Sequence, residues 1–517
     1  MVWQPELDEF KRRRELAEQM GGPEGITRQH SHGKLTVRER IAALADPGSF
    51  QEIGVLAGRG VYENDKLVGF TPANSVIGLC SLNGRKIVLS GGDFTVRGGA
   101  ADAAVAGKVY YAVELAMQWR LPYIRLLDAT GGSVRTFEIL GRTYIPDNPG
   151  TLTATKLLGI VPVVSAVLGS VAGLPAVEAC MAHFNVMVKG SSQVFAGGPP
   201  VVKAALGYDI TKEELGDEHT QVYQAGVIDN VAKSEYEAFD IIRCFLSYMP
   251  DNVWEMPTRV ETTDDPNRRE EELLSIIPRE GRKGYNPHEI LELVLDRGSF
   301  FEIAPYYGRS RIIGLARVNG YPVGVMINNP MFLGGSMDVA AGDKVIRFLQ
   351  LCNTFHLPMV YFADEPGFMV GLEAQQQGIV RAGARIVCVT CDTKMPWITF
   401  VIRQLYGVAG GLHIRPGGMY RRYAWPSANW GSMHIEGGAM AAYRREIEAA
   451  PDQEAKRQEI ENRLKAIASP FRSAEAFNIE DIVDPRDTRP LLCEFVEMVQ
   501  KNIKAQLGPT TNLSFRP

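Results

Sequence analysis

Short apolar runs and longer helical patterns follow one another along the chain in a regular order. The run 86–90 predicts a strand that closes on two glycines, and the small, apolar, proline-free segment 100–119 predicts a helix of about five turns. Leu121-Pro122 ends that helix, and 123–127 has the pattern of the next strand. The same order returns at 322–328, 342–355 and 358–363. Strands that alternate with helices predict an α/β fold built from crossover units.

The second half of the chain repeats landmarks of the first half. The segment 46–53 (Asp-Pro-Gly-Ser-Phe-Gln-Glu-Ile) returns at 296–303 (Asp-Arg-Gly-Ser-Phe-Phe-Glu-Ile). Landmarks further along share one slightly shorter spacing, namely Gly78-Leu79 with Gly314-Leu315, Asn83-Gly84 with Asn319-Gly320, Lys108 with Lys344, Leu121-Pro122 with Leu357-Pro358, and Asp128 with Asp364. Repeats of this length predict a duplicated domain and not a solenoid of short units.

Chain length and local charge indicate where the two halves divide. A chain of 517 residues exceeds what one hydrophobic core usually serves, so two domains of roughly 250 residues are expected. The stretch 252–286 is charged and contains prolines, which is typical of a connecting segment. We therefore expect an N-terminal domain at 1–265 and a C-terminal domain at 266–517.

Composition argues against several classes of function. The net charge is −5, and no basic tail or patch indicates a nucleic-acid partner. The seven cysteines are scattered and odd in number, and the first eight residues lack a signal-peptide pattern; both features favour a reducing cytoplasm. The uncharged stretch 158–177 is long enough to cross a bilayer, but its prolines and glycines favour a buried strand at 161–168 followed by a glycine turn. No membrane role is therefore expected.

Familiar catalytic motifs are missing from the sequence. It contains no GxxxxGK[ST], no GxGxxG, no GxSxG and no HExxH. Cys388 and Cys391 form a CxxC pair without a second pair at zinc spacing, and their apolar surroundings favour small core residues over metal ligands. We expect no metal site in this chain.

Clusters of small residues at the ends of predicted strands are the remaining candidates for chemistry. They occur at matching places in the two halves, at 128–132 and 168–174 and again at 364–367 and 406–411. Glycine lets a ligand approach the backbone, and a turn that feeds a helix leaves amide N–H groups unpaired. Such amides can hold an oxyanion. Tight turns that serve packing are the alternative interpretation, and the matching positions favour function.

Blocks spread over nearly the whole chain resemble one enzyme family. They are 32–41 with 46–50, 93–96, 214–216 with 226–229, 364–368, 381–385 and 424–428. In these blocks the sequence resembles the carboxyltransferases, namely the β subunits of propionyl-CoA and methylcrotonyl-CoA carboxylases and the related sodium-pump decarboxylases.

The resemblance implies a fold, partners and a mechanism. Each half would have the crotonase-like (ClpP/crotonase) spiral fold, and the active site would lie between the N-half of one subunit and the C-half of another, in a homo-hexamer. Acyl-CoA would lie mainly along the N-half, and CO2 from carboxybiotin would reach its α (or vinylogous) carbon through an enolate held by two amide oxyanion holes. The chain lacks a biotinylation motif and an ATP-grasp-sized domain, so a biotin carboxylase and a biotin carboxyl carrier would be separate partners.

The oxyanion holes of the family carry over onto two loops of this chain. In the N-half they fall on Gly173 and Leu174, and the following Pro175 has no N–H. In the C-half they fall on Val408 and Ala409, with Gly410 or Gly411 as the alternative register. With the strand-end clusters, the substrate-binding candidates are Gly131, Gly132, Gly407, Gly410 and Gly411.

Gly411 also suggests the size of the acyl group. It aligns with an Asp or apolar position that the family uses to size the acyl pocket. Loss of that side chain leaves more room, so we expect an acyl group larger than, or different from, acetyl and propionyl.

Three other functions stay open at this point. A decarboxylase would run the same site in reverse, from a malonyl-type CoA ester to biotin and onward to a membrane pump. A biotin-independent hydratase or isomerase would need a carboxylate at the loops, for which Glu178 and Glu365 are the candidates. A catalytically inactive assembly subunit would explain the altered Leu174-Pro175 loop.

Overall fold

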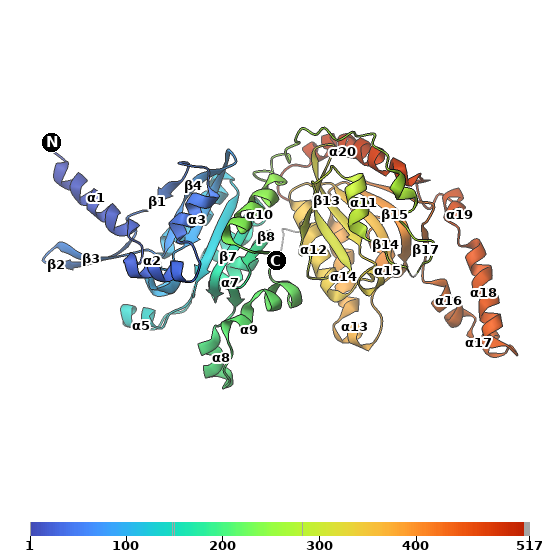
Figure 1. The fold of residues 1–517 in the computed structure, drawn as a ribbon, viewed down its shortest axis with the longest axis horizontal. Helices are drawn as coiled ribbons and strands as arrows, with labels where there is room; N and C mark the ends of the chain where they lie inside the picture. Colours follow the sequence, from blue (N-terminus) through green and yellow to red (C-terminus); the bar gives the residue numbers. More distant parts are fainter. Residues whose placement is uncertain (1, 147, 149, 282, 511–517) are drawn as a thin grey trace. The chain divides into compact units, whose positions relative to one another are not determined.

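The computed structural model describes residues 2–146, 148, 150–281 and 283–510. The chain divides into two compact units, with the boundary between Glu255 and Met256. This boundary lies within the charged stretch 252–286, where the sequence also places the division after residue 265. Figure 1 shows the first unit in blue to green and the second in yellow-green to red.

The first unit is built on one mixed sheet with helices around it (Figure 1). The strand order is β1-β4-β5-β6-β7-β8-β10, and β9 pairs with β7. The strands are β1 Gln51–Ile53, β4 Ser75–Leu82, β5 Arg85–Gly92, β6 Tyr123–Ala129, β7 Val163–Ala172, β8 Phe184–Val188, β9 Gln193–Phe195 and β10 Asn230–Ala232. The helices are α1 Gln4–Glu18, α2 Gly22–Ser31, α3 Val37–Leu44, α4 Ala106–Trp119, α5 Arg135–Leu140, α6 Gly150–Leu157, α7 Leu174–Cys180, α8 Pro199–Leu206, α9 Lys212–Gly216 and α10 Glu235–Ser247.

The second unit repeats this plan. Its strand order is β11-β12-β13-β14-β15-β16-β18, and β17 pairs with β15. The strands are β11 Phe301–Ile303, β12 Arg311–Val318, β13 Tyr321–Asn328, β14 Met359–Glu365, β15 Trp397–Tyr406, β16 Tyr420–Ala424, β17 Asn429–Gly431 and β18 Asp481–Ile482. The helices are α11 Pro287–Val294, α12 Val339–Thr354, α13 Leu372–Gln376, α14 Ile379–Asp392, α15 Gly407–Leu412, α16 Ile435–Ala442, α17 Arg444–Glu448, α18 Gln453–Ile467, α19 Pro470–Glu475 and α20 Thr488–Ala505.

The two sheets have the same order and the same register, which confirms the predicted duplication and the α/β fold. Glu52 pairs with Gly78 across β1 and β4, and Glu302 pairs with Gly314 across β11 and β12. In the second unit, apolar side chains of α11 and α20 form a core with one face of β12 to β15. Helix α12 lies on the opposite face, where Cys352 and Phe348 approach Gly324 of β13.

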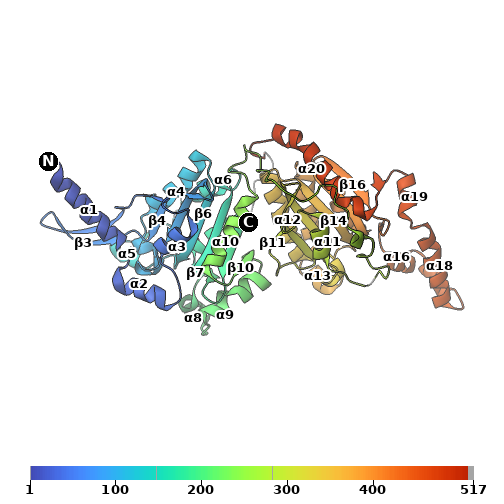
Figure 2. The same cartoon turned by 45° about the horizontal axis from the view of Figure 1, so that its top comes forward.

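An inserted hairpin explains why the repeat has two spacings. Strands β2 (Gly58–Glu63) and β3 (Lys66–Pro72) form a separate two-stranded sheet, which projects from the first unit in Figure 2. Residues 54–74 link β1 to β4, whereas only 304–310 link β11 to β12. Landmarks after this link are closer to their repeats than landmarks before it. The difference equals the extra length of the first link.

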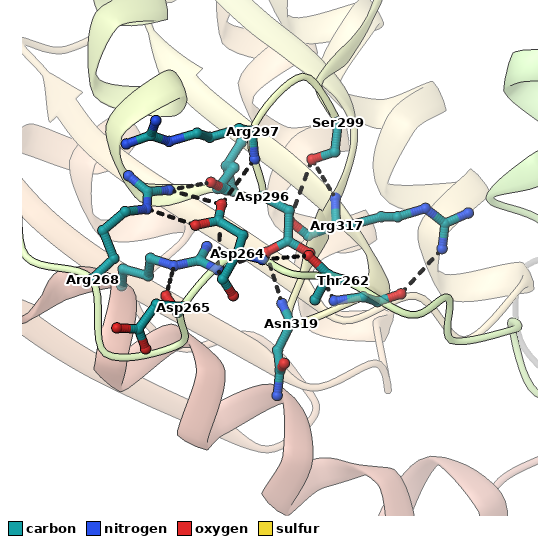
Figure 3. A network of polar contacts seen from close by, with 12 residues as sticks. Thr262, Asp264, Asp265, Arg268, Asp296, Arg297, Ser299, Arg317 and Asn319 are labelled. Carbon is teal, nitrogen blue, oxygen red and sulfur yellow. Dashed lines mark hydrogen bonds and ion pairs between the residues drawn. The ribbon is translucent and has the colours of Figure 1, made fainter.

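A carboxylate at the same place in each unit explains why the Asp and Asn-Gly landmarks recur together. The Asp46 carboxylate accepts hydrogen bonds from the N–H groups of Asn83 and Gly84, at 2.9 and 2.8 Å. The Asp296 carboxylate does the same for Asn319 and Gly320, at 3.0 and 2.7 Å (Figure 3). Both Asn-Gly pairs have positive φ, so each Asp fixes a tight β-hairpin turn.

Two details of these elements differ from the sequence-based expectations. Helix α4 begins at Ala106 and not at residue 100, because Ala100 pairs with Gly131 in a β-bridge and Ala104 is extended. The glycine turn expected after Leu168 lies instead at Gly173, since β7 continues through Gly169. A side chain at Gly169 would clash with the Asp128 carboxylate, so this glycine serves packing within the strand.

The interpretation of Cys388 and Cys391 as core residues is wrong. Both are exposed, because they lie on the outer face of α14. Within the described residues, no helix combines the length and apolar character needed to cross a bilayer.

Candidate active site

In the first unit, the loops after β6 and β7 come together at Gly131 and Gly173. Gly131 has a φ of 76°, and a Cβ there would lie 2.5 Å from the carbonyl oxygen of Ala172. A Cβ on Gly173 would lie 4.0 Å from the Cα of Gly131. A Cβ on Gly132 would meet nothing within 4 Å, and this residue is exposed. The sequence candidates Gly131 and Gly173 are therefore neighbours, and Gly131 is glycine because the chains approach so closely.

Of the two amides that the sequence proposes in this loop, the structure leaves Leu174 available. The N–H of Gly173 donates to the carbonyl oxygen of Phe195 at 3.3 Å. Leu174 is the first residue of α7, where a helix offers no internal acceptor to an N–H group. Pro175 has no N–H to contribute. Leu174 itself is 37% exposed.

The equivalent loop of the second unit joins β15 to α15. Gly407 has a φ of 65°, close to the 67° of Gly173. Val408 and Ala409 follow in the first turn of α15, where the helix does not use their N–H groups. Val408 is 67% exposed and Ala409 is buried.

The two glycines after Ala409 have different environments. A Cβ on Gly410 would lie 2.8 Å from the backbone carbon of Leu405, so packing requires glycine there. A Cβ on Gly411 would meet nothing within 4 Å. Only Gly411 therefore has space for a side chain.

A cavity of about 800 Å³ lies beside the glycine loops of the first unit. It is lined by Gly98, Thr130 and Ser170 at the ends of strands or in the loops that follow them. Its basic lining residues come from separate helices and loops and are Arg28, His32, Lys34, Arg97, Arg135 and Lys212. Asp102 is the acidic residue among those that line it. The cavity therefore has a strongly basic wall.

Some of these cations are compensated and others are not. Lys34 donates to the buried Asp128 carboxylate at 2.9 Å and lies 4.6 Å from the ring centre of Phe94. Arg97 approaches Asp102 at 3.7 Å. Arg28 and Arg135 are exposed, and neither forms an ion pair with an acidic group in the described part of the chain. These two guanidinium groups are free to bind an anion.

A cavity of about 710 Å³ occupies the equivalent place in the second unit. Gly334 and Gln404 line it at the repeat positions of Gly98 and Ser170, which line the first cavity. Among the described residues that line it, the charges are largely neutralised, since Arg403 binds Asp364 at 2.9 Å and Lys465 binds Glu436 at 3.0 Å. The two cavities thus share a position in the fold and differ in charge.

Neutral polar groups line the second cavity. Gln404 of β15 and Asn429 of β17 are paired neighbours in the sheet. The hydroxyl of Tyr406 donates to Asn429 Oδ1 at 2.7 Å, and the Tyr406 ring lies 4.0 Å from the ring of His434. His434 is in turn anchored to the carbonyl oxygen of Pro366 at 2.8 Å. Carboxamides and aromatic rings in this arrangement suit an uncharged polar ligand.

Comparison with known proteins decides the family. Residues 28–511 match the carboxyl transferase domain. The chain belongs to the carboxyl transferase family.

Relatives of this carboxyl transferase cover nearly its whole length. It is 33% identical to the propionyl-CoA carboxylase carboxyltransferase subunit of Haloferax mediterranei, over 98% of both proteins. It is 29% identical to the methylmalonyl-CoA decarboxylase subunit alpha of Veillonella parvula, over 93% of this chain and 92% of that protein. The solved transcarboxylase 12S structure, a hexamer with methylmalonyl-CoA bound, matches with a TM-score of 0.87 and 30% identity over 99% of this chain and 97% of that one. The expected pair of crotonase-like domains is thereby confirmed.

The two carboxylates that a biotin-independent hydratase would need differ in burial, since Glu365 is fully buried and Glu178 is half-buried. Glu365 is fully enclosed and forms an ion pair with the equally buried Arg311. Burial raises the pKa of Glu365, and its oxygens also accept from Gly367 N–H and the Asn328 amide. Burial likewise raises the pKa of Glu178, with the charge of Arg125 opposing the shift. Glu365 has no access to a substrate, so it serves the structure of the second unit.

Sequence reasoning missed the basic wall of the first cavity and the loops at 97–99 and 333–335. Both loops are single turns with three successive positive φ values, and Gly98 and Gly334 line the two cavities. Their Gly-Gly pairs keep the same spacing as the other late landmarks of the repeat, so a fuller search of the repeat finds them. No such signal marks the basic residues, because they come from four separate segments, at 28–34, 97, 135 and 212.

Proposed function

We propose that this carboxyl transferase is the carboxyltransferase subunit of a biotin-dependent acyl-CoA carboxylase. The single observation that carries the proposal is the pair of equivalent cavities, one basic and one nearly neutral, each beside a glycine loop that opens a helix. The names of the relatives agree with it, since they act on propionyl-CoA or methylmalonyl-CoA.

The basic cavity of the first unit suits coenzyme A. Coenzyme A carries three phosphate groups, and arginine binds phosphate through paired N–H groups. The uncompensated Arg28 and Arg135 are the first candidates for these contacts, with Lys212 and His32 nearby in the same wall. The acyl thioester would then lie toward Gly131 and Leu174.

The nearly neutral cavity of the second unit suits the ureido ring of biotin. Gln404 and Asn429 offer amide donors and acceptors that match a ureido group, and Tyr406 and His434 offer ring surfaces. Carboxybiotin supplies the carboxyl group that is transferred. By analogy with the family, the partner loop comes from the N-half of another subunit in a homo-hexamer, and the biotin arrives on a carrier protein loaded by a biotin carboxylase in the cytoplasm.

Backbone amides supply the electrostatic stabilisation. The N–H of Leu174 in one unit and those of Val408 and Ala409 in the other would bind the oxygen on which negative charge develops, including the enolate oxygen of the thioester. Removal of one such donor typically costs about 3 kcal/mol in the transition state. This role requires no side-chain nucleophile.

The proposal is tested with the purified chain, free biotin and a panel of carboxylated acyl-CoA esters. This reverse half-reaction needs neither ATP nor the partner proteins, and we expect biotin-dependent release of CO2 from at least one ester. No release from any ester by folded, assembled protein would overturn the proposal and favour an assembly subunit.

One pair of variants isolates the Leu174 amide. Leu174→Pro removes the N–H at the first helical position, which tolerates proline, and is expected to lower turnover about 100-fold. Leu174→Ala keeps the N–H and is expected to stay within a few-fold of the native chain. Equal activity of the two variants would remove Leu174 from the oxyanion hole.

A biotin-dependent decarboxylase is the second candidate function, favoured by the similarity to the Veillonella parvula protein. The carboxylase and the decarboxylase functions are distinguished by an assay that supplies ATP, bicarbonate, a biotin carboxylase and its biotinylated carrier with the uncarboxylated CoA ester. Net formation of the carboxylated ester identifies a carboxylase.

A further inference from the structure

Two exposed thiols on one helix have no role in the proposed carboxyl transfer. Cys388 and Cys391 lie in the last two turns of α14 (Ile379–Asp392), and both side chains are exposed. The helix turns its other face to the unit, where Ile386, Val389 and Thr390 are buried. The CxxC spacing therefore presents both sulfur atoms on the outer face of the helix.

Helix geometry brings the two cysteines within reach of a disulfide. Positions three apart in an α-helix have Cα atoms about 5 Å apart, inside the range of about 4.4–6.8 Å found in disulfides. Their Cβ atoms are about 5–6 Å apart, and a disulfide needs about 4 Å. Closure thus requires a local tightening of the last turn. Thr393, directly after the helix, is already extended, so no further helical turn resists this change.

The remaining cysteines are unsuited to such chemistry. Cys80, Cys352 and Cys493 are buried, and burial raises the pKa of each thiol, to about 12 for Cys80 and about 11 for Cys493. Because the thiolate is the nucleophile in disulfide exchange, these thiols are unreactive. Cys180 and Cys244 are half-buried and lie on separate helices. Among the seven cysteines, only Cys388 and Cys391 are both exposed and closely spaced.

We propose that Cys388 and Cys391 form a redox-active dithiol that exchanges with small disulfides such as oxidised glutathione and closes to a disulfide within α14. One thiolate attacks oxidised glutathione, forms a mixed disulfide and releases one glutathione thiolate. The other cysteine then displaces the second glutathione from the mixed disulfide. The two cysteines lose two electrons and two protons, and two molecules of reduced glutathione result.

The surroundings of the helix end make this disulfide easy to reverse. The carbonyl oxygen of Thr390 accepts from Thr393 N–H at 3.3 Å and from Gly417 N–H at 3.2 Å. The chain at Gly417 packs so closely that a Cβ there would clash with the carbonyl oxygen of Cys391. Tightening the last turn strains these contacts. Strained, exposed disulfides are reduced readily, so glutathione is expected to reopen the bond.

The test exposes the folded, full-length protein to oxidised glutathione, blocks the remaining thiols and maps the peptides by mass spectrometry. The peptide with Cys388 and Cys391 is expected to be lighter by two hydrogen atoms, to resist alkylation at both residues and to regain two reactive thiols with reduced glutathione. Two thiols that remain alkylatable, or a glutathione adduct that persists on the native pair, would overturn the proposal.

Single variants check that closure is intramolecular. Cys388→Ser and Cys391→Ser are each expected to stop at a mixed disulfide with one glutathione. The matched control Cys244→Ser keeps the pair and is expected to close as the native protein does. Failure of the control to close, or closure in either single variant, contradicts the assignment.

Discussion

At the scale of single residues, both units keep a buried aspartate at the same place, but the arginine that pairs with it comes from a different element in each unit. Asp128 and Asp364 are both fully buried at the ends of equivalent strands. Asp128 is paired with Arg40 of α3 at 3.1 Å, whereas Asp364 is paired with Arg403 of β15. Gly169 occupies the strand position equivalent to Arg403. The Asp128 carboxylate fills the space that a side chain at position 169 would need. The buried charge is therefore balanced in both units by different elements.

His413 is predicted to make the protein sensitive to mild acid. It is fully buried beside Trp397 and Tyr361, and burial, with a smaller contribution from Arg311, lowers its pKa to about 3. The unfolded chain binds a proton below about pH 6.5 and the folded chain does not. Stability is therefore complete above pH 6.5 and falls by about 1.4 kcal/mol per pH unit as the pH drops toward 3.

The measurement is the thermal midpoint at pH 7.5 and pH 5.5. The native chain is expected to lose more on acidification than His413→Leu, and the exposed control His219→Gln should behave like the native chain. An unchanged acid response in His413→Leu would contradict this account.

Gly411 is predicted to set the acyl preference. It has open space at its Cβ position, so Gly411→Asp is expected to fold normally and to shift relative kcat/KM toward shorter acyl groups. Gly410→Asp is the contrasting variant, because its Cβ would meet Leu405 at 2.8 Å, and it is expected to lower the thermal midpoint. An unchanged ranking of acyl-CoA esters in Gly411→Asp would mean that this position does not line the acyl pocket.

At the scale of elements, the two Asp-capped hairpins repeat one device in different surroundings. Asp46 binds its turn. Asp296 binds its turn (Figure 3) and also forms an ion pair with the buried Arg489 at 2.9 Å. We expect Asp46→Asn to cost about 1 kcal/mol and Asp296→Asn about 2 kcal/mol, because the second change also takes a charge-assisted hydrogen bond from the buried Arg489, which keeps only its longer ion pair with Asp264 at 3.5 Å.

Urea unfolding of the two hairpin variants checks this difference. The signal from each unit must be followed separately, since the units need not unfold together. Equal losses in the two variants would show that the Asp296–Arg489 pair adds no stability.

Sequence alone predicts elements with local signals and misses contacts between distant segments. The strand 86–90 is found because its apolar run ends at two glycines, and 358–363 because its run begins at a proline. The duplication is found because hairpin turns need Asp, Asn and Gly at fixed places. The start of α4 is misplaced because a bridge between Ala100 and Gly131, which are distant in the chain, overrides helix propensity.

The site follows the same rule. The glycine loops are predictable because Gly173 and Gly407 need positive φ. The sequence does not predict that the Gly173 N–H donates to the carbonyl oxygen of Phe195, because β9 approaches this loop only through its pairing with β7.

At the scale of the whole molecule, one fold is used twice and the copies differ in charge. The first cavity has a basic wall from α2, α5 and α9, and the second has neutral carboxamides and internal ion pairs. Duplication supplied two equivalent cavities, and substitution in their walls is what would let one hold an anionic thioester and the other an uncharged ring.

Binding of coenzyme A to the native chain and to three arginine variants tests most directly whether the first cavity holds the anionic ligand. Titration calorimetry is expected to show about tenfold weaker binding for Arg28→Ala and for Arg135→Ala, since each loses a charge-assisted phosphate contact. Arg445→Ala changes an exposed arginine of the second unit that lines neither cavity, and this variant should bind as the native chain does. Unchanged affinity in both first-unit variants, or equal weakening in the control, would contradict the assignment of coenzyme A to the first unit.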